Sequence, residues 1–225
     1  MTRKERAAEL TKRLPRIYPE AHCELDYKSP LDLLIATILS AQCTDKRVNI
    51  VTQELFKVAK TASDYADISQ AALEKIIHST GFYRNKAKNI RAAAVALIEK
   101  HDGKVPRNMD SLAALPGVGR KTANVVLGNA FDINDGIVVD THVGRLSRRL
   151  HLTKHNDAVK IENDLVKLIP RDNWCIFSHW LIWHGRRRCM ARNPDCKNCE
   201  LRDICPSADK VLTPIPKTKS KKAKV

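Results

Sequence analysis

One short stretch governs how this chain is organised: Leu115-Pro116-Gly117-Val118-Gly119-Arg120-Lys121-Thr122-Ala123-Asn124. Pro116 ends a helix, and Gly117 and Gly119 let the backbone turn sharply without a Cβ in the way. A second helix is predicted from about Arg120 to Ala130, so that its unpaired N–H groups and the positive end of its dipole face outward. These residues fit an anion-binding hairpin and, equally well, a plain corner between two helices. The spacing of a nucleotide-binding P-loop is missing.

Helical periodicity dominates the chain on both sides of this hairpin. Ser29 is predicted to cap a helix that begins at Pro30 and is apolar on nearly every face through Leu39, as in a buried helix. Asp110 is expected to cap a short helix just before the hairpin. Three more helices are predicted over residues 140–150, 156–169 and 172–184. Only residues 136–139 look strand-like, which is too short a run for a sheet, so we predict an all-α protein.

The composition indicates a folded protein with a polyanionic partner. The 225 residues are 43% hydrophobic and 29% charged, which is enough to build a real core. The 40 Lys and Arg residues exceed the 25 Asp and Glu residues and leave a net charge of +15. Such a surplus favours nucleic acid as the partner, ahead of an acidic membrane surface. A charge that serves only solubility is the alternative, although balanced charge would serve that purpose with less self-repulsion.

The ends of the chain suggest where the protein works. No segment approaches the roughly 18 consecutive apolar residues of a membrane-spanning helix, and residues 2–13 lack the apolar core of a signal peptide. We therefore expect a cytoplasmic protein that associates with the nucleoid. Residues 209–225 are rich in Lys and are expected to form a basic, disordered tail that holds DNA loosely.

The hairpin stretch resembles the helix–hairpin–helix of the endonuclease III family of DNA glycosylases. Two more segments resemble that family, Ser40-Ala41-Gln42-Cys43-Thr44-Asp45 and Val138-Val139-Asp140-Thr141-His142-Val143. The likeness extends from about Leu25 to Cys205. It implies a bifunctional glycosylase and abasic-site lyase that removes oxidised pyrimidines in base excision repair and cuts the backbone by β-elimination. It also implies a monomer whose partner is duplex DNA with a damaged base or an abasic site.

The resemblance makes Lys121 the nucleophile and Asp140 its catalytic partner. A neutral lysine amine attacks C1′, the base leaves, and the resulting Schiff base permits β-elimination of the 3′ phosphate. Free lysine is protonated at neutral pH, so we expect the helix start, the neighbouring Arg120 and partial burial to lower the pKa of Lys121. Asp140 is expected to accept the amine proton and to stabilise positive charge on the sugar. The alternatives are a phosphate-binding surface lysine and a structural helix cap.

Other residues take roles by the same likeness. The residues implied in phosphate binding at the hairpin are Gly117, Gly119 and Arg120. Gln42 would fill the gap left by the flipped-out nucleotide, although a polar residue at a helix end fits it equally well. The residues implied in support of the active site are Ser40, Asp45 and His142. Some relatives carry an acidic residue where this chain has Ala113, which implies a shifted range of lesions.

Four cysteines crowd together near the C-terminus in the pattern Cys189-x6-Cys196-x2-Cys199-x5-Cys205. Four thiolates from one loop satisfy either a tetrahedral zinc ion or a 4Fe–4S cluster. The spacing resembles the iron–sulfur loop of the endonuclease III family at every interval, which favours the 4Fe–4S cluster. We expect the cluster to be structural and to fix a loop of basic residues against DNA, namely Arg186, Arg187, Arg188, Arg192 and Lys197.

The predicted architecture is two helical domains with a DNA-binding groove between them. A six-helix domain over residues 23–134 carries the hairpin, and an iron–sulfur domain combines residues 1–22 with 135–208. Lys121 and Asp140 would lie at the mouth of the groove. A monofunctional relative such as an adenine glycosylase would lack the lysine after the hairpin. A non-catalytic DNA-binding module would need the hairpin and the basic loop but neither Lys121 nor Asp140.

Overall fold

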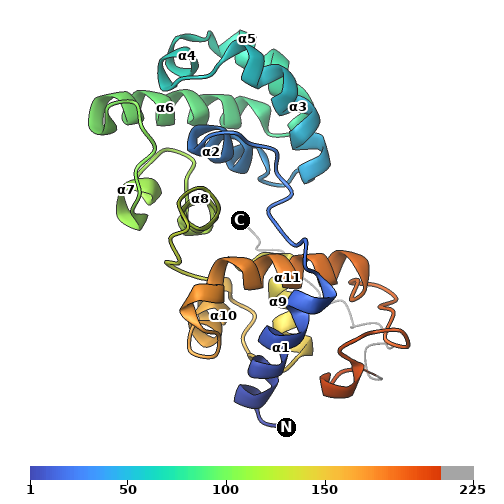
Figure 1. Ribbon diagram of the computed structural model, residues 1–225. Coiled ribbons are helices and arrows are strands. Elements are labelled where there is room, and N and C mark those ends of the chain that lie inside the picture. The colour runs from blue at the N-terminus through green and yellow to red at the C-terminus, as the bar shows by residue number, and fades with distance from the viewer. Residues whose placement is uncertain (209–225) are drawn as a thin grey trace, which may run out of the picture.

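The computed structural model describes residues 1–208, which form an all-helical protein (Figure 1). The α-helices are α1 Arg3–Ile17, α2 Pro30–Leu39, α3 Asp45–Val58, α4 Ala62–Asp67, α5 Gln70–Ile77, α6 Tyr83–His101, α7 Met109–Ala113, α8 Arg120–Phe131, α9 Thr141–Arg149, α10 Ala158–Leu165 and α11 Trp174–Arg187. Three 3-10 turns are η1 His78–Thr80, η2 Arg171–Asn173 and η3 Arg202–Ile204. No strand occurs among residues 1–208, so the all-α prediction is confirmed. The predicted basic tail lies outside the described residues.

The helices form two halves, each around its own hydrophobic core (Figure 1). Helices α2 to α8 surround the first core, and α1 packs with α9, α10 and α11 around the second. These cores support the predicted division at residues 23, 134 and 208, which stays a prediction. In the described chain the first half has seven α-helices where six were predicted, because Thr61 caps a further short helix, α4. Within that same range, no helix has both the length and the apolar character to cross a membrane.

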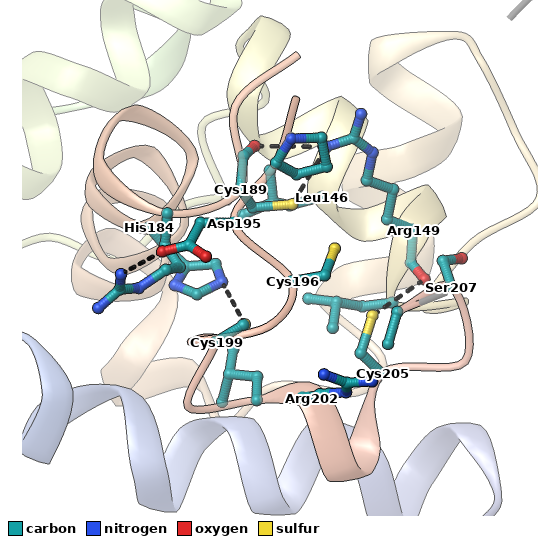
Figure 2. A pocket seen from close by; sticks show the side chains of 15 residues that line it. Leu146, Arg149, His184, Cys189, Asp195, Cys196, Cys199, Arg202, Cys205 and Ser207 are labelled. Carbon is teal, nitrogen blue, oxygen red and sulfur yellow. Dashed lines mark hydrogen bonds and ion pairs between the residues drawn. The ribbon is translucent and has the colours of Figure 1, made fainter. Parts of the chain in front are cut away.

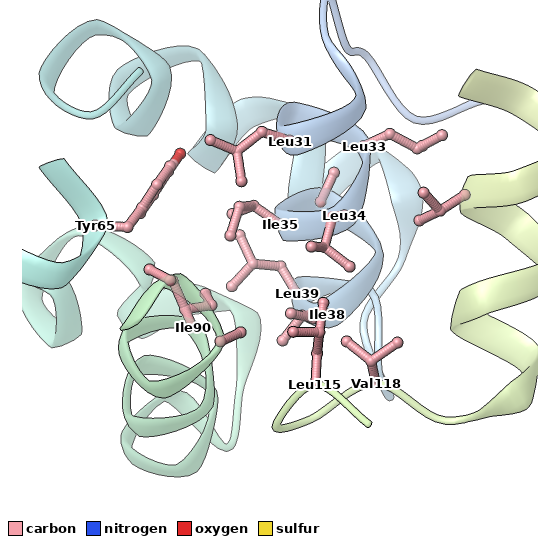
Figure 3. Close-up of a cluster of buried hydrophobic side chains, with 14 of the residues drawn as sticks. Leu31, Leu33, Leu34, Ile35, Ile38, Leu39, Tyr65, Ile90, Leu115 and Val118 are labelled. Atoms are coloured by element: carbon pink, nitrogen blue, oxygen red, sulfur yellow. The ribbon is translucent and has the colours of Figure 1, made fainter. Parts of the chain in front are cut away.

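Helix α2 is the centre of the first core because it is buried along almost its whole length. Ser29 Oγ accepts the N–H of Asp32 at 3.1 Å, and the Asp32 carboxylate accepts the N–H of Ser29 at 3.1 Å. This capping box starts the helix at Pro30. Every residue from Leu31 to Leu39 is buried, which confirms the predicted buried helix. The side chains that pack around it include Tyr65, Ile90, Leu115 and Val118 (Figure 3).

The predicted helices of the second half exist, but some of their ends differ. Helix α10 is shorter than the predicted 156–169: Asp157 caps its start and accepts the N–H of Lys160 at 3.0 Å, and the helix ends at Leu165. Helix α11 continues past residue 184 to Arg187. Before the hairpin, the cap of α7 is Asn108 and not Asp110, because the Asn108 side chain accepts the N–H of Ser111 at 2.9 Å.

The two halves meet where α8 crosses α11. A Cβ on Gly128 would lie 2.6 Å from Cys175 Sγ and 2.9 Å from Cys175 Cβ, so the missing side chain allows this close approach. Next to the crossing, the N–H of Cys175 donates to Asn134 Oδ1 at 2.9 Å. His179 Nε2 also lies 2.7 Å from Asn129 Oδ1. The crossing therefore fixes how the two halves sit on either side of the space between them.

The crossing gives a prediction on stability. We expect Gly128→Ala to lower the free energy of unfolding by about 1–3 kcal/mol, because the methyl group overpacks against Cys175. Gly144→Ala is the matched control, since its Cβ would lie 3.6 Å from Ile161 Cδ1 in an ordinary contact. The control should be neutral, or more stable by up to about 1 kcal/mol through helix propensity. Urea unfolding measures both; equal stabilities would contradict the close crossing.

Candidate active site and DNA-binding hairpin

The hairpin is a type II turn followed directly by α8. The N–H of Val118 donates to the carbonyl of Leu115 at 3.1 Å, with Pro116 and Gly117 as the central residues. Gly117 has a φ of 76°, the left-handed value that the third position of this turn requires. A Cβ there would also lie 2.8 Å from the Cβ of Asn89 on α6. Backbone conformation and packing therefore both require glycine at position 117.

The start of α8 is open to an anion. Gly119 is the N-cap residue and offers no side chain to the amides of the first turn. A Cβ on Gly119 would meet nothing within 4 Å, so the surface in front of these amides is accessible. Uncapped amides at the positive end of a helix dipole are a favourable place for a phosphate. The hairpin therefore has the geometry that phosphate binding needs.

Arg120 is engaged with the other half of the protein. Its Nη2 lies 3.0 Å from Glu162 Oε1, and its Nε lies 3.2 Å from Glu162 Oε2. Glu162, on α10, is 7% exposed and also accepts from Asn124 Nδ2 at 3.2 Å. This ion pair ties the first turn of α8 to the second half. The phosphate contact of Arg120 stays a prediction, and it would have to share the guanidinium with Glu162.

Lys121 and Asp140 line one pocket of about 650 Å³ between the two halves. The first half contributes Thr37, Ser40, Asp45, Lys121 and Val125. The second half contributes Val138, Asp140, Ser178, His179, Ile182 and Arg186. Of the remaining predicted residues, Gln42 is exposed between α2 and α3, and His142 Nδ1 lies 3.2 Å from Arg145 Nη2, outside the lining. The structure thus joins Ser40, Asp45, Lys121 and Asp140 in one place.

The two principal residues are held differently. Lys121 lies in the first turn of α8 and is exposed, so the partial burial expected from the sequence is wrong for the protein without DNA. The reason is that the pocket opens to solvent between the halves. Asp140 is the N-cap of α9, as predicted, and its Oδ1 accepts the N–H of Val143 at 2.7 Å. A carboxylate has two oxygens and several lone pairs, so this cap can also take part in chemistry.

Arg186 bridges the two halves across the pocket. Its Nη2 lies 2.6 Å from Asp45 Oδ2, and its Nη1 forms an ion pair with Glu24. Burial raises the pKa of Asp45, and the nearby Asp140 carboxylate raises it further, whereas Lys121 opposes the shift. The guanidinium therefore pairs with Asp45, one of the two carboxylates of the pocket, while the Asp140 carboxylate caps α9.

Three of the arginines expected to face DNA form ion pairs with carboxylates of the protein itself. Arg187 Nη2 lies 3.2 Å from Glu24 Oε1, and Arg188 Nη1 lies 2.7 Å from Asp195 Oδ2. Together with Arg186, they hold the C-terminal loop and the linker before α2 in place. The expectation that these three arginines contact phosphates stays a prediction, and such contacts would have to compete with the local carboxylates that pair with them. The exposed basic residues of the loop include Arg192 and Lys197.

The four cysteines of the C-terminal loop line one cavity (Figure 2). All four are partly buried and none forms a disulfide. Arg149 Nη1 donates to Cys189 Sγ at 3.2 Å, and His184 Nε2 lies 3.6 Å from Cys199 Sγ. Among residues 1–208, no three ligating side chains are close enough to hold a single metal ion. Four thiols around one cavity, with nitrogen donors next to two of the sulfurs, have the chemistry of a metal–sulfur site.

Phe82 is a candidate that the sequence analysis missed. Its side chain is 64% exposed, and it is the only aromatic residue among the large exposed apolar side chains of the described chain. It has a φ of 49°, and the exposed Gln42 has a φ of 54°, so both lie in the left-handed region. The available signal in the sequence was an aromatic residue directly after a glycine, Gly81.

Comparison with known proteins places the chain in a family. The family described as HhH-GPD superfamily base excision DNA repair protein matches residues 35–171, which is more than half of the chain. Endonuclease III of Synechocystis sp. is 54% identical to this chain and covers 92% of it and 94% of its own length. Endonuclease III of Escherichia coli (strain K12) is 40% identical, with 92% and 98% covered.

Solved structures agree with the sequence relatives. A non-covalent endonuclease III–DNA complex matches with a TM-score of 0.88 and 44% identity over 93% of this chain and 98% of that chain. A trapped endonuclease III–DNA covalent intermediate matches with a TM-score of 0.89 and 44% identity over 95% and 100%. The resemblance seen in the sequence is therefore confirmed. The chain belongs to the endonuclease III family, within the HhH-GPD superfamily of base excision DNA repair proteins.

Proposed function

We propose that this protein is a bifunctional DNA glycosylase and abasic-site lyase that removes oxidised pyrimidines from duplex DNA in base excision repair. The observation that carries the proposal is the meeting of Lys121 and Asp140 in one pocket, directly beside the open hairpin. A covalent endonuclease III–DNA intermediate, from a protein 44% identical to this chain, supports a nucleophilic mechanism. Because the proposed substrate is DNA, we infer that the protein acts in the cytoplasm, at the nucleoid.

The chemistry follows from the placement of the residues. The hairpin amides around Gly119 bind a phosphate next to the lesion, and the damaged nucleotide flips out into the pocket. The Lys121 amine, after giving a proton to Asp140, forms a bond to C1′ while the bond to the base breaks and the base leaves with the electron pair. The sugar ring opens to a Schiff base, a C2′ proton is lost, and the 3′ phosphate departs. Water then releases Lys121.

Bound DNA supplies what the pocket lacks when it is empty. Lys121 is exposed, and DNA laid over the groove would exclude water from the pocket around it. The Asp140 carboxylate then faces the sugar in a drier site, where it stabilises the positive charge that develops as the base leaves. Gln42 fills the gap in the duplex. The exposed ring of Phe82 enters the stack as an apolar wedge that bends the DNA.

We also propose a 4Fe–4S cluster on Cys189, Cys196, Cys199 and Cys205. The support is that the four thiols line one cavity and that Arg149 and His184 place nitrogen atoms next to two of the sulfurs. When bound, the cluster supplies four covalent cross-links to a loop that has little regular structure of its own. The loop then presents Arg192 to the DNA backbone as a phosphate contact.

Borohydride trapping tests the nucleophile. The wild type, mixed with a duplex that contains one oxidised pyrimidine, should give a covalent protein–DNA band because borohydride reduces the Schiff base. Lys121→Ala should give no band, while its affinity for DNA falls only about two- to threefold, since one charge among many is lost. A band from Lys121→Ala would contradict the assignment. No band from the wild type on this duplex or on an abasic duplex, with DNA binding intact, would contradict the lyase mechanism and leave a monofunctional glycosylase or a non-catalytic DNA-binding protein.

The two roles of Asp140 can be separated by one substitution. Asn is as good an N-cap as Asp, so Asp140→Asn should keep the free energy of unfolding within about 0.5 kcal/mol. Base removal should fall about 10²–10³-fold, because the charge and the proton acceptor are lost. Asp140→Ala is the control that loses the cap as well and costs about 1 kcal/mol. Single-turnover base excision measures the catalytic role, and thermal unfolding measures the capping role. Full activity in Asp140→Asn would show that Asp140 serves only as a helix cap.

Metal analysis tests the cluster. The purified protein should be yellow-brown and contain about four iron atoms per chain, as a 4Fe–4S cluster requires. Cys199→Ser should lose colour and iron and unfold at a lower temperature, because the loop loses a cross-link. Cys23→Ser is the matched control, a partly buried cysteine outside the loop, and should keep both. A colourless protein with one zinc per chain would overturn the cluster but leave the Lys121 mechanism intact.

A further inference from the structure

Lys86 is a buried lysine whose contacts join two loops. It lies in the first turn of α6 and is 4% exposed. Its Nζ donates to the carbonyl oxygen of Leu39 at 2.7 Å and to that of Thr80 at 2.8 Å. Leu39 is the last residue of α2, and Thr80 is the last residue of η1. One ammonium group therefore holds the ends of two helices that are far apart in the sequence.

The Lys86 ammonium group and the two helix ends that it contacts stabilise one another. The last carbonyls of a helix have no partner inside the helix and carry the negative end of its dipole, so a cation placed there is stabilising. A buried ammonium group is costly unless its donors are satisfied. Both acceptors of Lys86 are neutral carbonyls, and within residues 1–208 no carboxylate forms an ion pair with it. If either helix end moved, the buried charge would lose one of these partners.

The two helix ends lead directly into the strained residues of the DNA-facing surface. Gln42 follows Leu39 by three residues and Phe82 follows Thr80 by two. Both have positive φ values, 54° and 49°, although neither is glycine. Such conformations cost energy and persist where the surrounding structure holds them in place. Lys86 is the group that anchors the start of both segments.

We propose that Lys86 is a positioning residue that couples the segments 40–43 and 80–83, so that Gln42 and Phe82 meet the DNA at a fixed spacing. The proposal rests on the proposed function, in which both residues enter the duplex beside the flipped nucleotide. Successive base pairs are only about 3.4 Å apart. A shift of roughly 1 Å in one segment would therefore misplace its side chain and reduce specific binding.

Amide hydrogen exchange of the protein without DNA tests the coupling itself. Lys86→Met keeps much of the side-chain length but removes all donors, and should speed exchange in both segments, 40–43 and 80–83, by about tenfold or more. Lys100→Met is the matched control, an exposed lysine at the other end of α6 with the same loss of charge, and should leave both segments unchanged. If Lys86→Met does not fold, Lys86→Gln, which keeps a shorter donor, takes its place. Faster exchange in one segment only, or in neither, would overturn the coupling.

DNA binding tests the positioning role. Lys86→Met should weaken binding to a duplex with a reduced abasic site by about tenfold, with little change for an undamaged duplex. Lys86→Arg, which keeps charge and donors, should restore most of this difference. An equal loss on both duplexes would overturn the positioning role. A wild-type protein that does not prefer the abasic duplex would contradict the proposed function, while hydrogen exchange would still decide whether Lys86 couples the segments.

Discussion

The close crossing of α8 and α11 is the constraint on which the site depends. The sulfur of Cys175 occupies the space that a Cβ on Gly128 would need, so the helices approach this closely because residue 128 is glycine. Helix α8 runs from the crossing back to the hairpin, and the Arg120–Glu162 pair fixes its other end to the second half. Both ends of α8 are therefore fixed to the second half. This fixes the position of Lys121, in the first turn of α8, relative to Asp140 in the second half.

The electrostatics of the protein work at two ranges. The net charge of +15 attracts DNA from a distance. Close to the pocket, however, much of the positive charge is already paired, as in the contacts of Arg186 with Glu24 and Asp45. Internal pairing orders the loop and the linker before DNA arrives, which lowers the entropy lost on binding. The amides after Gly119 have no side-chain cap, and we propose them as the local binding place for a phosphate.

The sequence predicted the parts of the site that are encoded locally. Gly117, the cap at Asp140 and the buried helix after Pro30 each follow from a few neighbouring residues, and the structure contains all three. Contacts between residues far apart in the sequence left no local signal. Arg186 binds Asp45 across a sequence separation of 141 residues, and Lys86 binds Leu39 across a separation of 47 residues. The exposure of Lys121 was missed for a related reason, because it depends on the space between the two halves of the protein. The short cap at Asn108 was missed because Asp110, two residues on, has the same preference for a helix start.

Two lysines of this protein, the buried Lys86 and the exposed Lys121 that we propose as the nucleophile, have opposite surroundings. The ammonium group of Lys86 is enclosed and bonded to two carbonyls, whereas that of Lys121 stands open in the groove. Burial lowers the pKa of Lys86. Its hydrogen bonds to two helix ends give this lysine a structural role. Lys121 has no such enclosure, since its side chain is exposed at the start of α8. The same type of side chain thus serves two purposes here: an enclosed lysine joins two helix ends, and an exposed lysine lines the pocket that we propose as the active site.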